Sequence, residues 1–110
     1  MNKKKIYISI PISGRNIERV KADCLNAKIV IDDSGFEAVS PLDVSPDSKS
    51  TYAEHMGKDI AALLNCDAAV FLDDWQLSSG CNLERRACEI YNKIVFDGLN
   101  DFATNKYKLI

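Results

Sequence analysis

The sequence predicts an α/β protein in which helices cover both faces of a parallel sheet. Short apolar or β-branched runs alternate with segments whose apolar residues recur at three- and four-residue steps. The run at residues 68–72 is apolar throughout, which is typical of a parallel strand buried on both faces. Glycine, proline and serine separate the segments. This alternation predicts right-handed crossovers and a three-layer architecture.

The first half of the chain contains two predicted strands around one helix. Residues 5–10 are β-rich and predict the first strand, which proline and glycine end in a loop at residues 11–15. Residues 16–31 predict an amphipathic helix that Gly35 terminates, and residues 36–40 predict the second strand. The side chains expected to point inward from this helix are Ile17, Val20, Cys24, Ala27 and Val30.

A polar segment at residues 42–50 is expected to be a long loop, a kind of connection that is often functional. Ser50 or Thr51 then caps a second helix that runs to about residue 65, and residues 66–72 form the third strand. The side chains expected to point inward from this helix are Met56, Ile60, Leu63 and Leu64.

The last third of the chain predicts a helix at residues 79–91 and a fourth strand at residues 93–96. The tail at residues 100–110 is weakly patterned, with room for a short helix and a final strand at residues 107–110. The side chains expected to point inward from the helix are Leu83, Ala87, Ile90 and Tyr91.

These elements favour a flavodoxin-like (Rossmann-like) sheet of four or five strands in the order 2-1-3-4(-5). Strands one and three are then neighbours, and ligands of such sheets bind at that switch point. The loops at residues 11–15 and 73–80 should face each other across one crevice. We expect Glu84 to form the floor of this crevice and to be the reactive group.

Composition limits the classes of function. The 110 residues form one domain, residues 1–110, and a formal charge of −2 gives no strong field toward a nucleic acid polymer or a membrane. Lysines 3–5 are expected to be a solvated terminus rather than part of a signal peptide, so we expect a cytoplasmic location.

The cysteines and the histidine do not predict a metal site or a cofactor. None of the cysteines forms a C-x-x-C pair, and His55 is the only histidine. Cys24, Cys66 and Cys88 are expected to be small core residues. Cys81 lies near a predicted helix N-terminus, where the pKa of a thiol can fall, but a catalytic cysteine would have only His55 as its partner.

The first loop lacks both the G-x-G-x-x-G and the G-x-x-x-x-G-K-[ST] signatures. Ser13, Gly14 and the amides that enter the next helix could hold an anion, because an exposed helix N-terminus can do so. An ordinary turn explains the same residues equally well.

Carboxyl groups are the more informative set, comprising Asp59, Asp73, Asp74 and Glu84. Two carboxyl groups beside a sugar C1′ can divide the work of nucleophile and acid, roughly 5–5.5 Å apart in retaining chemistry. The helix N-terminus should favour an ionised Glu84. The alternative is that Glu84, next to Arg85 and Arg86, is an ordinary surface residue, and the residues alone favour that alternative.

Three segments in order carry a family resemblance. They are Ile-Tyr-Ile-Ser at residues 6–9 followed by Pro-Ile-Ser-Gly at 11–14, Asp-Ile-Ala-Ala-Leu-Leu-Asn-Cys-Asp at 59–67, and Trp-x-x-Ser-x-Gly-x-x-x-Glu-x-x-Ala at 75–87. Together they resemble the nucleoside 2-deoxyribosyltransferase-like superfamily, and most of all its small branch of domains of unknown function. The resemblance covers about residues 5–96, and it implies a flavodoxin-like fold that cleaves N-glycosidic bonds of deoxynucleosides or their 5′-monophosphates.

The resemblance implies roles for individual residues. Glu84 would be the nucleophile on C1′, Asp59 would assist proton transfer at the base, and Tyr7 would contact the nucleophile within hydrogen-bond reach. Ser78 would hold the sugar or phosphate, and Gly80 would let the backbone approach closely. Where monophosphate hydrolases of the superfamily carry Arg-Gly, this chain has Ser13-Gly14, with Arg15 one place later.

The resemblance also bears on Trp75 and on assembly. Trp75, which follows Asp74 in the crevice loop, could stack on a base or lie in a subunit contact. The relatives are oligomeric, so a homodimer or larger assembly that completes the site is expected. No cofactor is implied.

The function expected from these observations is N-glycosidic bond cleavage, or deoxyribosyl transfer, through a covalent glutamyl-sugar intermediate, with a nucleoside or nucleoside monophosphate as substrate. One alternative is a non-catalytic nucleotide-binding module on the same fold. Another is a structural or interaction protein. Release of free base separates the enzyme from both alternatives.

Overall fold

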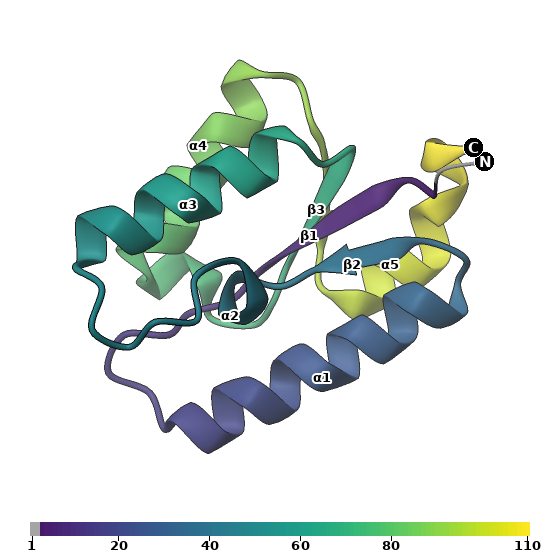
Figure 1. Cartoon of the computed structure of the whole chain (residues 1–110). Helices are drawn as coiled ribbons and strands as arrows, with labels where there is room; N and C mark the ends of the chain where they lie inside the picture. The colour runs from purple at the N-terminus through teal and green to yellow at the C-terminus, as the bar shows by residue number, and fades with distance from the viewer. Residues whose placement is uncertain (1–2) are drawn as a thin grey trace.

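The computed structural model describes residues 3–110 and places four parallel strands in one sheet (Figure 1). The strands are β1 (Lys5–Ser9), β2 (Glu37–Val39), β3 (Ala68–Phe71) and β4 (Ile94–Asp97), in the order β2-β1-β3-β4. Tyr7 pairs with Ala69 on one side and with Val39 on the other. The predicted strand order is therefore confirmed, and β1 and β3 are neighbours at the switch point.

Helices pack on both faces of the sheet because side chains alternate along each strand (Figure 1). Ile6, Ile8 and Val70 point toward α1 (Ile17–Asp33) and α5 (Leu99–Asn105). Tyr7, Ala69 and Phe71 point toward α3 (Tyr52–Leu64) and α4 (Ser79–Ile90). Among residues 3–110, no helix is both long enough and apolar enough to cross a membrane.

Two segments differ from the expected fold. The polar segment after β2 starts with a short helix, α2 (Pro41–Val44), because the Ser40 hydroxyl accepts the Leu42 N–H and proline suits a first helical position. The expected strand at residues 107–110 is wrong, because α5 continues into a 3₁₀ helix, η2 (Lys106–Leu109). Leu109 packs into the core from η2, so its burial needs no fifth strand.

The expected inward faces of the helices are partly wrong. In α1, Val20, Cys24 and Ala27 are buried as expected, but Ile17 is exposed and Ile31 takes an inner position. In α3 the buried residues are Asp59 and Leu63.

The largest difference is in α4, where Leu83, Ile90 and Tyr91 at its end are exposed. The buried side chains of α4 are those of Cys81, Glu84 and Cys88. The inner face of α4 therefore carries a carboxyl group. Apolar periodicity alone assigns the wrong face of this helix to the interior.

Candidate functional site

Glu84 lies in the second turn of α4, on the face that packs against β1, and is only 4% exposed. The Ser78 hydroxyl caps this helix by accepting the Cys81 N–H at 3.2 Å. Neither neighbouring arginine pairs with Glu84, because Arg85 binds Asp97 at 2.6 Å and Arg86 binds Glu89 at 2.8 Å. The alternative of an ordinary surface glutamate is therefore wrong.

Two hydroxyl groups of β1 hold the Glu84 carboxyl group. The Tyr7 hydroxyl donates to Oε2 at 2.5 Å, and the Ser9 hydroxyl donates to Oε1 at 2.7 Å. Both side chains are fully buried. The predicted hydrogen bond between Tyr7 and Glu84 is confirmed. Ser9 was missed, although its position two residues after Tyr7 on the same strand places it on the same face.

Asp59 completes a buried carboxyl pair. It lies in α3, whose first turn is fixed by a capping box between Thr51 and Glu54, and it is 7% exposed. Its charge raises the pKa of both Tyr7 and Glu84, so it lies near enough to act on both groups electrostatically. Within the described chain its Oδ1 has no hydrogen-bond partner. A buried polar atom without a partner is uncommon and marks a candidate point of contact for a ligand.

Burial dominates the electrostatics of the pair. It raises the pKa of Glu84 to about 7, against the lowering effect of the hydrogen bonds from Tyr7 and Ser9. It raises the pKa of Asp59 to about 6, against the lowering effect of His55. The expectation that the helix N-terminus keeps Glu84 readily ionised is not met, because Glu84 lies beyond the first turn and is desolvated.

Cys81 does not fit the role of a catalytic thiol. Burial raises its pKa instead of the decrease considered possible near a helix N-terminus. The ring of His55 contacts the Ser45 hydroxyl, with Nδ1 at 2.5 Å from Oγ. The four cysteines are buried free thiols, which confirms the core positions expected for Cys24, Cys66 and Cys88. The described part of the chain holds no cluster of metal-ligating side chains.

The N-terminal end of α4 is covered by α3. A methyl group on Gly80 would lie 3.2 Å from the Met56 sulfur and 3.5 Å from the Tyr52 hydroxyl oxygen. The space that glycine leaves is therefore filled by α3 side chains. Tyr52 is 56% exposed, so this cover lies at the molecular surface.

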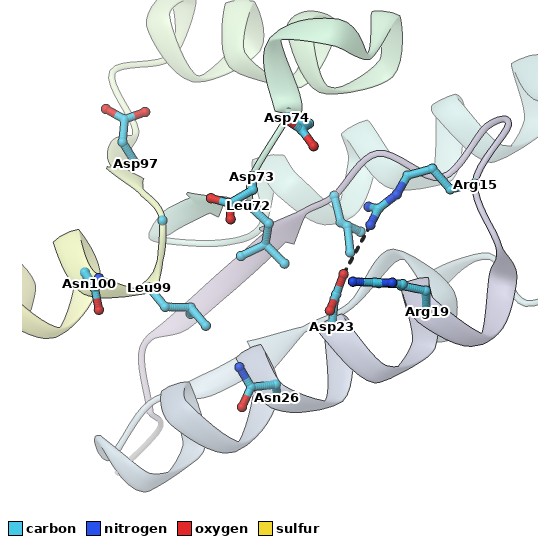
Figure 2. A pocket seen from close by; sticks show the side chains of 12 residues that line it. Arg15, Arg19, Asp23, Asn26, Leu72, Asp73, Asp74, Asp97, Leu99 and Asn100 are labelled. Atoms are coloured by element: carbon cyan, nitrogen blue, oxygen red, sulfur yellow. Dashed lines mark hydrogen bonds and ion pairs between the residues drawn. The ribbon is translucent and has the colours of Figure 1, made fainter.

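The predicted crevice exists, but Glu84 is not its floor. A pocket of about 510 Å³ lies at the carboxyl ends of β1, β3 and β4, with Arg15 and Arg19 on one wall and Asp73 across from them (Figure 2). Ile10 and Leu72 line it from the α1 side of the sheet. Glu84 belongs to the opposite side, because it bonds side chains that point toward α3 and α4.

A second pocket of about 400 Å³ adjoins the first and shares its residues Leu72, Asp73, Asp74 and Asp97. Asp74 lines both pockets and adopts a left-handed backbone conformation with φ of 68°. Trp75, at the start of the 3₁₀ helix η1 (Trp75–Leu77), lines the second pocket. Its ring lies 4.6 Å from the Arg85 guanidinium and packs edge-on against Phe71.

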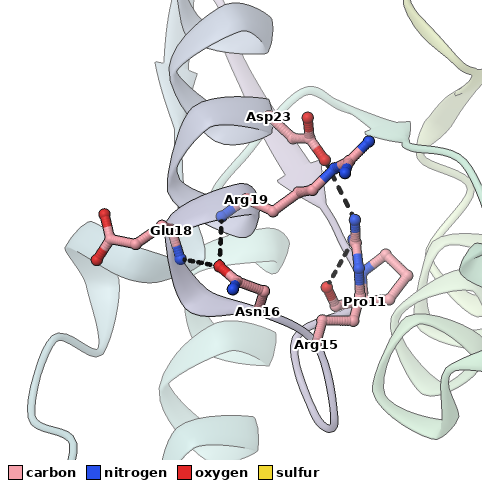
Figure 3. A network of polar contacts seen from close by, with 6 residues as sticks. All are labelled: Pro11, Arg15, Asn16, Glu18, Arg19 and Asp23. Carbon is pink, nitrogen blue, oxygen red and sulfur yellow. Dashed lines mark hydrogen bonds and ion pairs between the residues drawn. The ribbon is translucent and has the colours of Figure 1, made fainter.

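The first loop is braced by its own residues (Figure 3). The Arg15 guanidinium donates to the Pro11 carbonyl at 3.1 Å and pairs with Asp23 at 3.2 Å. Asn16 caps α1 by accepting two backbone N–H groups. Ser13 and Gly14, at the exposed tip of the loop, line neither pocket, and Gly14 has a φ of 76° that suits a turn.

Together, the fold and the site define an α/β protein with a buried pair of carboxyl groups at the carboxyl end of a flavodoxin-like sheet. A sequence model of the family described as "Domain of unknown function (DUF4406)" matches residues 4–97, and the chain belongs to this family. No curated protein matches the chain.

The raised pKa of Glu84 predicts a pH-dependent stability. A carboxyl group whose pKa is about 7 in the folded protein, against 4.5 ordinarily, stabilises the fold fully below 4.5 and loses this effect as pH rises through 7. The unfolding free energy of Glu84→Gln minus that of wild type should therefore be larger at pH 8 than at pH 4, by about 3 kcal/mol. Urea unfolding at both pH values measures this difference.

The exposed Glu89, which pairs with Arg86 on the same helix, provides the control. Glu89→Gln should change stability by less than about 1 kcal/mol at either pH. An equal effect of Glu84→Gln at pH 4 and pH 8 would show that burial does not perturb Glu84.

Proposed function

We propose that this protein cleaves the N-glycosidic bond of a nucleoside or nucleoside monophosphate through a covalent ester between Glu84 and the sugar. The observation that carries the proposal is the presence of two buried carboxyl groups, of which Glu84 accepts two hydroxyl hydrogen bonds and Asp59 has a buried oxygen, Oδ1, without a partner in the described chain. The resemblance of residues 5–96 to the nucleoside 2-deoxyribosyltransferase-like superfamily supports the same roles.

In the proposed first step, an ionised oxygen of Glu84 attacks C1′ of the sugar and forms a C–O bond. The C1′–N bond breaks, and its electron pair goes to the base nitrogen, which takes the proton of the Asp59 carboxyl group. In the second step, water or a second base forms a bond to C1′. The ester C–O bond then breaks, its electron pair returns to Glu84, and Asp59 takes the proton of the incoming nucleophile.

The proposed roles require one protonation state of the pair, with Glu84 ionised and the proton on Asp59. With pKa values of about 7 for Glu84 and about 6 for Asp59, the pair holds a single proton over much of the interval between them, more often on Glu84 than on Asp59. The productive form is therefore the minor singly protonated form, and it is most populated between the two pKa values. Tyr7 would orient Glu84, and Ser78 and Gly80, at the N-terminal end of the same helix as Glu84, remain the proposed contacts of the sugar. Ser13 and Gly14 line neither pocket, and Asp74 and Trp75 line pockets outside the carboxyl pair, so these four residues are not assigned to this substrate.

Substrate access requires movement of the cover formed by α3. Met56 and Tyr52 pack over Gly80, about one and two turns before Asp59 on α3. We also infer a homo-oligomer, for which the exposed apolar side chains of Leu83, Ile90 and Tyr91 provide a surface. A cytoplasmic location would fit a nucleotide substrate.

A non-catalytic binding module is the second candidate. The observation that favours it is that the two pockets at the sheet edge are open, whereas Glu84 is almost fully buried outside them. A ligand in these pockets would contact the charged walls without reaching the carboxyl pair.

The test incubates the protein with deoxynucleosides, ribonucleosides and their 5′-monophosphates and separates the products by chromatography. The proposed function predicts free base, with free sugar or, when a second base is present, a new nucleoside. Tight binding without release of base would instead establish the binding module.

A further inference from the structure

Ser9 is the last residue of β1, and its surroundings fix it in place. It is fully buried, its backbone pairs with Phe71, and its carbonyl accepts the Leu72 N–H at 2.9 Å. The hydroxyl group therefore has little freedom beyond its own rotation. It points at Glu84 Oε1, the oxygen that Tyr7 does not bind.

The two carboxyl groups of the site differ in their hydrogen bonds. Glu84 accepts one hydroxyl hydrogen bond at each oxygen, whereas no donor in the described chain reaches Asp59 Oδ1. A hydrogen bond donated to a carboxylate favours its charged form, and the absence of a donor favours the protonated form. The hydrogen bonds therefore favour ionisation of Glu84, whereas its deeper burial favours protonation.

We propose that Ser9 is a positioning residue whose hydroxyl group stabilises the ionised form of Glu84, the form that the nucleophile requires, against the effect of burial. The inference rests on the proposed function for its catalytic consequence, but the effect of Ser9 on the ionisation of Glu84 stands without it. The titratable groups that face Glu84 are Tyr7 on β1, Asp59 on α3, and the thiols of Cys81 and Cys88 on α4. Of these, only Tyr7 also donates a hydrogen bond to Glu84.

The experiment titrates the side-chain carboxyl groups by ¹³C NMR, with the Glu84 and Asp59 signals assigned from Glu84→Gln and Asp59→Asn. Ser9→Ala should move the Glu84 midpoint upward by about one pH unit, because a hydrogen bond to a charged group is lost. Ser9→Thr keeps the hydroxyl and should restore the wild-type midpoint. The control outside the site is Ser34→Ala, which removes a hydroxyl group that donates to the Val30 carbonyl.

If base release is found, Ser9→Ala should lower kcat about tenfold at pH 6.5 with little change in KM. The acid limb of the pH profile of kcat should move upward together with the Glu84 midpoint. An unchanged Glu84 midpoint in Ser9→Ala overturns the inference. A shifted midpoint in a protein that releases no base supports the role of Ser9 in the ionisation of Glu84 and rejects the proposed function alone. If Ser9→Ala does not fold, Ser9→Cys, a much weaker donor of similar size, replaces it with the same expected direction.

Discussion

Replacement of Glu84 by glutamine is expected to lower the rate of base release by at least about 1,000-fold, because the amide cannot form the ester with C1′. Glutamine is nearly isosteric and can keep a hydrogen bond with Tyr7 or Ser9, so the fold should remain intact. Chromatographic measurement of free base under saturating substrate gives the ratio of kcat values. Glu89→Gln, on the exposed side of α4, should retain wild-type activity.

Stability separates loss of chemistry from loss of structure. Because the stability of Glu84→Gln relative to wild type is expected to rise by about 3 kcal/mol between pH 4 and pH 8, an inactive folded variant with this pH dependence would fit removal of a buried reactive group. Activity within tenfold of wild type would mean that Glu84 does not form the ester.

Replacement of Asp59 by asparagine is expected to lower kcat by about 10²- to 10⁴-fold for natural bases, because the leaving nitrogen receives no proton. In wild type, protonation of Glu84 removes the nucleophile at low pH, and ionisation of Asp59 removes the acid at high pH. With pKa values of about 7 and 6, the profile should be a narrow bell centred between them. Asp59→Asn should lose the alkaline limb.

A substrate with a better leaving group isolates this role. A nucleoside whose base departs as a stable anion needs no proton, so Asp59→Asn should cleave it at nearly the wild-type rate. An equal loss for natural and activated substrates would assign Asp59 a structural role in α3 in place of proton transfer.

The fold could be predicted from the sequence where local pattern and global topology agree. The apolar run that became β3 and the helical period before it leave few alternatives to a parallel sheet with β1 beside β3. The tail could not be predicted, because Leu109 is buried from a 3₁₀ helix. A short segment with one buried apolar residue has the same sequence pattern in a 3₁₀ helix as in a strand. Likewise, Ser40 and Pro41 start a helix too short to show a period.

The candidate site was predicted only in part, for a physical reason. Glu84 and Asp59 face inward on helices, which apolar periodicity cannot reveal, and family resemblance was needed to single them out. Ser9 has no signal of its own, since a serine in a strand is ordinary until its partner is known. The pKa of Glu84 depends mainly on desolvation by burial, so the position in the helix alone gave the wrong sign.

The central claim is that Glu84 becomes covalently bonded to the sugar during the reaction. Rapid acid quenching during turnover, followed by peptide mapping by mass spectrometry, tests it directly. The account predicts that a peptide containing Glu84 gains the mass of one dehydrated sugar residue, and that Glu84→Gln shows no such adduct. Base release by wild type with an unmodified Glu84 peptide, or with the adduct on another residue, would contradict the account.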